Sequence, residues 1–106
     1  MTIIIHTKSP ESLYKAINSK IINDELKTWE IKEDSEGKVL YNHSPHQWTD
    51  RVLLKPINCT FGLQLEINWW SNQQEPDDAT KGYILGRFTE ILMVHFRKYF
   101  EKIELK

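Results

Sequence analysis

Residues 63–70 alternate apolar and polar side chains and end in two tryptophans. Successive side chains on a β-strand project to opposite faces, so this segment predicts a half-buried strand with one apolar and one polar face. Trp69 continues the apolar face, whereas Trp70 interrupts the polar face that Glu66 and Asn68 form. Because exposed aromatic patches are typical of partner surfaces, Trp70, Glu66 and Asn68 are the first candidate binding residues.

The N-terminal part of the chain predicts one helix and several strands. Residues 2–6 are rich in β-branched isoleucine, which favours a short buried strand, and Ser9 followed by Pro10 is a typical helix start. Residues 29–32 and 39–41 alternate on either side of a turn-forming segment, which predicts a hairpin.

Residues 51–55 predict a further strand, and Pro56 is expected to end it because proline cannot donate a ladder hydrogen bond. The strongest helix follows residues 76–78, where a proline and two acids favour a helix N-terminus. His95 falls inside the broad apolar face of this helix. The apolar face of this helix comprises Ile84, Leu85, Phe88, Ile91, Leu92, Phe96 and Tyr99.

Residues 102–106 alternate again and predict a short closing strand.

The predicted order is therefore strand, helix, four strands, helix, strand. This order is typical of an α+β two-layer sandwich, in which a mainly antiparallel sheet of about five to six strands carries both helices on one face. The chain of 106 residues is expected to form a single domain, residues 1–106. The second face of the sheet would then be open, and Trp70 would lie on it.

Charge and cysteine content exclude several classes of function. Fourteen basic and fifteen acidic residues give a net charge of -1, so no overall field draws the protein to nucleic acid or to an anionic membrane. The single Cys59 excludes an intramolecular disulfide, and the apolar run at the N-terminus is too short for a signal peptide, so we expect a cytoplasmic protein. The chain has no phosphate-binding glycine loop and no dinucleotide fingerprint, so we predict no cofactor.

The loop from His43 to Asp50 gives an alternative hypothesis. His43, His46 and Asp50 are spaced as metal ligands or an acid–base pair could be, and His95 could join them in a pocket beneath the second helix. This would make the chain a small enzyme or a ligand-binding domain. No second Cys/His pair completes a four-ligand set, so a solvated loop without a metal is the simpler interpretation.

The segment around the predicted hairpin is acidic, with six acids against two lysines. Such charges commonly protect a sheet edge, but an acidic edge beside exposed aromatic residues could also meet a basic protein and speed its association. The acids are Asp24, Glu25, Glu30, Glu33, Asp34 and Glu36.

The sequence thus favours a small, non-catalytic protein-binding module that docks through the open sheet face and the acidic hairpin. Trp70 would anchor the contact, and Trp48 and Tyr41 are secondary binding candidates. The partner would be another protein, such as a basic enzyme that an inhibitor or immunity-type protein neutralises. Both a monomer and a homodimer remain open, including a homodimer whose open sheet faces pack together.

Overall fold

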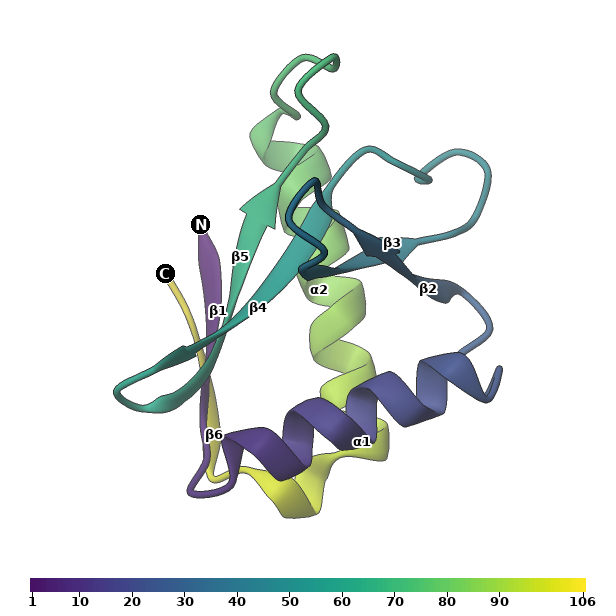
Figure 1. The fold of residues 1–106 in the computed structure, drawn as a ribbon. Helices are drawn as coiled ribbons and strands as arrows, with labels where there is room; N and C mark the ends of the chain where they lie inside the picture. The colour runs from purple at the N-terminus through teal and green to yellow at the C-terminus, as the bar shows by residue number, and fades with distance from the viewer.

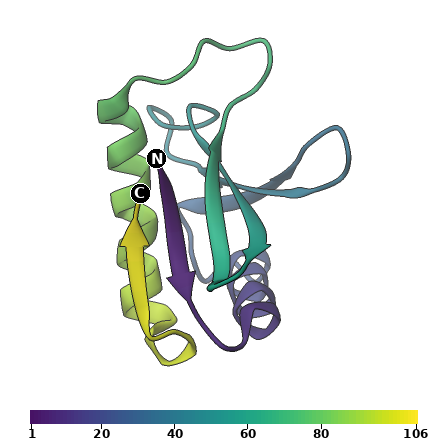
Figure 2. The same cartoon turned by 90° about the vertical axis from the view of Figure 1, so that its left-hand side faces the viewer.

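The computed structural model describes residues 1–106 as six strands and two α-helices in the predicted order. The strands pair antiparallel in one sheet of order β2-β3-β4-β5-β1-β6. Both helices lie on one side of the sheet, to the right of β1 and β6 in Figure 1 and behind the strands in Figure 2. The fold is therefore an α+β two-layer sandwich. The elements are β1 (Thr2–His6), α1 (Pro10–Ile22), β2 (Trp29–Glu33), β3 (Val39–His43), β4 (Leu53–Cys59), β5 (Gly62–Asn68), α2 (Asp78–His95), a 3₁₀ turn (Arg97–Tyr99) and β6 (Lys102–Leu105).

The alternation in β5 decides which face of the sheet is open. Leu63 and Leu65 are buried on the helix side, while Gln64 and Glu66 are only partly buried on the opposite side. The strand ends at Asn68, two residues earlier than the predicted segment, so both tryptophans lie just beyond the sheet. Neither helix is long and apolar enough to cross a lipid bilayer.

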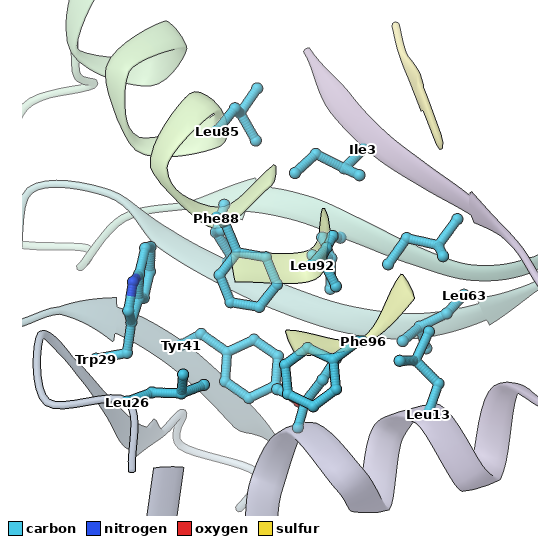
Figure 3. Close-up of a cluster of buried hydrophobic side chains, with 14 of the residues drawn as sticks. Ile3, Leu13, Leu26, Trp29, Tyr41, Leu63, Leu85, Phe88, Leu92 and Phe96 are labelled. Carbon is cyan, nitrogen blue, oxygen red and sulfur yellow. The ribbon is translucent and has the colours of Figure 1, made fainter. Parts of the chain in front are cut away.

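The core fills the space between the helices and the sheet. Phe88 of α2 lies at its centre, with the Tyr41 ring stacked at 5.4 Å between centroids and the Trp29 ring edge-on at 4.9 Å (Figure 3). Tyr41 is fully buried, and its hydroxyl donates to Asn18 Oδ1 at 2.6 Å. The expectation that Tyr41 contributes to a binding surface is therefore wrong, because its position in β3 directs it to the helix side.

Pro56 does not end β4, contrary to the prediction. It lies within the strand and pairs with Leu65, whose backbone groups point toward β1. The missing N–H of Pro56 therefore faces β3, not β5. On that side the ladder consists only of Tyr41 with Leu54 and Asn42 with Leu53, so no ladder hydrogen bond is lost at Pro56.

Helix α2 begins as the acids predict and ends slightly earlier than expected. The carboxylate of Asp77 accepts the backbone N–H of Thr80 at 2.8 Å, which caps the helix. The side chain and then the backbone of Thr80 lower the pKa of Asp77. His95 ends the helix and is exposed, contrary to its predicted place in the apolar face. Along this side of α2, Ile84 is buried, Ile91 is half-buried and His95 is exposed.

Candidate functional site

Trp70 lies on the open side of the sheet, and a carboxylate holds its indole. The indole Nε1 donates to Asp50 Oδ1 at 2.9 Å, and the residue is only partly buried. Lys32 Nζ lies 3.7 Å from the same Asp50 oxygen and 3.6 Å from Glu30 Oε1. Trp70, Asp50, Lys32 and Glu30 thus form a connected polar network, which we call the Trp70 cluster.

Asn42 is the buried support of the Trp70 cluster. Its amide nitrogen donates to Glu30 Oε1 at 2.8 Å and to Thr49 Oγ1 at 3.1 Å, and its carbonyl oxygen accepts the Asp50 N–H at 2.9 Å. The side chain is fully buried, and a buried amide needs such partners. Asp50 itself has a φ of 62°, a left-handed conformation that aspartate tolerates better than most residues. Asn42 therefore fixes the loop that presents Asp50 to Trp70.

The sequence prediction missed Asn42, Lys32 and Thr49 as parts of this site. The available signal was the polar Asn42 at the end of an apolar strand run, since Leu40 and Tyr41 precede it directly. An asparagine in a strand interior is unfavourable unless its side chain is bonded, so it marks a specific contact.

The other predicted open-face residues lie near the Trp70 cluster but outside its hydrogen bonds. Asn68 pairs with Leu53 and Glu66 pairs with Lys55 and Thr2, and both side chains are partly buried. Trp69 is 36% exposed, although the prediction placed it toward the core. It lies at the rim of the helix layer, where the Lys81 ammonium is 5.6 Å from its ring centroid.

Trp48 packs the 44–51 loop onto helix α2. Its ring stacks on Tyr83 with 4.0 Å between centroids and 15° between planes. Tyr83 is also 6.4 Å from the His43 ring, and His43 is 4.6 Å from the Trp29 ring. Trp48 is half-buried, and its indole nitrogen has no hydrogen-bond partner. Its contacts join the loop to the core and leave little of the ring for a partner.

The alternative histidine pocket does not assemble. His43 is 3% exposed, and its Nδ1 donates to the Thr28 carbonyl at 2.9 Å, while burial lowers its pKa. His46 is exposed, and Asp50 is bonded to Trp70. His95 lies twelve residues after Tyr83, whose ring is 6.4 Å from that of His43, and twelve residues span about 18 Å along the helix axis. The structure contains no group of three His, Cys, Asp or Glu side chains that could hold a metal ion.

Part of the negative charge of the acidic hairpin is neutralised within the chain. Lys55 Nζ lies 3.0 Å from Asp34 Oδ2, and the other Asp34 oxygen accepts the N–H groups of Glu36 and Lys38, each at 2.9 Å. The Lys38 backbone bond is the largest cause of the lowered pKa of Asp34. Glu25 and Glu30 also have lysine partners. The acids of the hairpin region without an ion pair are Asp24, Glu33 and Glu36.

Comparison with protein-family models, with curated proteins and with solved structures found no match to this chain. The functional argument therefore depends on the geometry of the site itself.

Proposed function

We propose that this chain is a small protein-binding module whose recognition surface is the Trp70 cluster on the open face of the sheet. The observation that carries the proposal is the bond from the Trp70 indole to Asp50, which fixes one edge of the ring while part of it stays exposed. Tryptophan is over-represented among residues that dominate binding energy. A ring that is already immobilised loses less entropy when a partner covers it.

The surroundings of Trp70 favour a partner with a basic surface. Glu66 lies on the same face, and Glu33 and Glu36 lie at the tip of the β2–β3 hairpin without an ion pair. Lys32 and Lys55 lie on this face too, but each already contacts a carboxylate of its own chain. The unpaired acids would attract a basic protein and raise its association rate. An inhibitor or immunity-type protein that neutralises a basic enzyme is the form of this function that we propose, in the cytoplasm.

The dispersed histidines give no comparable support to a small enzyme. His95 lines a hollow beside Leu105, whereas His43 points into the aromatic contacts near Tyr83. No carboxylate is hydrogen-bonded to either ring, so neither has the oriented partner that a general base normally uses.

Three variants test the proposed surface. Trp70→Ala removes the ring, Trp70→Phe keeps an aromatic surface but not the Asp50 bond, and Trp69→Ala removes the neighbouring exposed tryptophan as a matched control. Wild-type protein is used to capture a partner from lysate of the native source, and the captured protein is then purified and titrated by calorimetry. We expect Trp70→Ala to weaken binding by about 30-fold or more, and Trp70→Phe to weaken it less.

Circular dichroism and thermal unfolding must first show that each variant is folded. The proposal is overturned if no protein is captured specifically, or if Trp70→Ala and Trp69→Ala bind the captured protein as wild type does. Equal losses for the two alanine variants would contradict the central place given to Trp70.

A further inference from the structure

The outward side of α2 is exposed and carries little charge. Tyr83, Met93 and Val94 are 38%, 50% and 73% exposed, and a Cβ added at Gly82 or Gly86 would meet no atom within 4 Å. A surface helix normally presents charged and polar residues to water, whereas this one presents mainly small and apolar residues. The α2 outward face comprises Ala79, Gly82, Tyr83, Gly86, Arg87, Glu90, Met93 and Val94.

Strand β6 extends this apolar surface. Leu105 is 59% exposed and forms, with Ile91, Met93 and Val94, part of the lining of a groove of about 640 Å³ along the C-terminal half of α2. Figure 2 shows β6 in front of α2 at the edge of the molecule. Contiguous exposed apolar surface of this kind marks an interaction site.

We propose that the α2 outward face packs against the same face of a second copy of this chain, with the two helices antiparallel about a two-fold axis near the middle of α2. The face is self-complementary in size at its glycines, because Gly82 and Gly86 lie in its first half and the larger Glu90 and Val94 lie in its second half. Antiparallel packing about residue 88 places Gly86 opposite Glu90 and Gly82 opposite Val94 of the second copy. Two-fold contacts require this kind of self-complementarity, and glycines allow helices to approach closely.

The face is also self-complementary in charge. Arg87 and Glu90 are its two charged residues, and within one chain Arg87 Nη1 donates to Glu90 Oε1 at 2.9 Å. They lie on either side of residue 88, so the two-fold axis brings each Arg87 beside the Glu90 of the second copy. The macrodipoles of two antiparallel helices also attract one another, because the positive end of each lies beside the negative end of the other. A parallel arrangement would instead place like charges side by side.

This contact uses different residues from the proposed partner surface. None of the residues of the α2 outward face belongs to the Trp70 cluster, although the 44–51 loop contacts both, through Trp48 on Tyr83 and Asp50 on Trp70. A dimer formed through α2 would therefore leave two Trp70 clusters free.

Sedimentation velocity across a range of protein concentrations tests the contact. We expect wild type to reach twice its chain mass of 12.6 kDa. Gly86→Glu places a bulky acid opposite Glu90 of the second copy, and a Cβ added at Gly86 would meet no atom within 4 Å. This variant should stay folded and raise the dimer dissociation constant about tenfold or more. Ser19→Glu on the exposed side of α1 is the matched control and should leave the dissociation constant unchanged.

A charge-reversal pair tests the antiparallel arrangement itself. Arg87→Glu alone and Glu90→Arg alone each place like charges across the axis, so each should weaken the dimer about tenfold or more. An equimolar mixture of the two should form a heterodimer with near wild-type affinity, because every cross-axis pair is then opposite in sign. A wild-type protein that keeps the mass of one chain overturns the proposal. A dimer dissociation constant that is unchanged by Gly86→Glu also overturns the proposal. So does a mixture of Arg87→Glu and Glu90→Arg that does not reach near wild-type affinity.

Discussion

Replacing Asn42 by alanine should destabilise the fold and loosen the Trp70 cluster. Asn42 is fully buried, and its side chain makes three hydrogen bonds, to Glu30, Thr49 and the backbone of Asp50. Alanine removes all three and leaves a small cavity behind. The Glu30 carboxylate and the Asp50 N–H then lose a partner that water cannot fully replace.

The size of the loss follows from those three bonds. A hydrogen bond contributes about 1 kcal/mol net, so three contribute about 3 kcal/mol. The Glu30 side chain is 44% exposed and regains part of its loss from water. We therefore expect the free energy of unfolding to fall by about 2 kcal/mol. Because Asn42 also holds the Asp50 backbone, the tryptophan emission of the chain, to which Trp70 contributes, should shift before the chain unfolds globally.

Urea unfolding followed by far-ultraviolet circular dichroism and by tryptophan fluorescence measures both effects. Asn68→Ala is the matched control, since Asn68 lies on the same face and has no hydrogen bond from its side chain. The control should lose less than about 0.5 kcal/mol. If Asn42→Ala lost no more than the control, the assignment of Asn42 as the support of the site would be wrong.

Two further predictions concern pH and backbone conformation. Burial lowers the pKa of His43 from its ordinary value of 6.5, so the unfolded chain binds this proton more readily than the folded chain. The contribution of His43 to the free energy of unfolding should therefore be fully present above about pH 6.5 and should fall as the pH drops below that value. In the His43→Gln variant, the free energy of unfolding measured with urea should depend less on pH between about pH 7.5 and 5.5. An unchanged slope in the variant would contradict this. Gly62 has a φ of +141°, and a Cβ there would lie 2.6 Å from the Ile5 carbonyl, whereas a Cβ at Gly37, with a φ of +77°, would meet only the Glu33 carboxylate at 3.7 Å. Gly62→Ala should cost about 3 kcal/mol in thermal or urea unfolding and Gly37→Ala about 1 kcal/mol, and equal losses would refute the close approach of β1.

The candidate site was only partly predictable from the sequence. Trp70 could be placed on the polar face of its strand because alternation is a local property of residues 63–70. Its bond to Asp50, twenty residues away, depends on how the 44–51 loop folds over the sheet. Tyr41 and His43 could not be placed on a face, because the short apolar run around them has no clear period.

The exposure of Trp69 and His95 also shows the difference between a local sequence pattern and a tertiary contact. Both lie on the side that the sequence pattern assigns to the core, but Trp69 directly follows the end of β5 and His95 is the last residue of α2, and both are exposed. A periodic pattern gives the direction of a side chain and not the extent of the element that would cover it. The exposed glycines of α2 follow the same rule, since nothing in this chain lies against them.

The sequence by itself determined the elements, their order, the helix starts and the α+β class, because these depend on hydrophobic period and on short-range helix-start and turn chemistry. Only the tertiary structure decided that β4 runs through Pro56, that Asn42 and Asp50 hold Trp70, and that the histidines lie apart. The order of strands in the sheet and the ends of each layer bring together residues far apart in the chain. Contacts of that kind depend on packing across the whole domain, which no local pattern encodes.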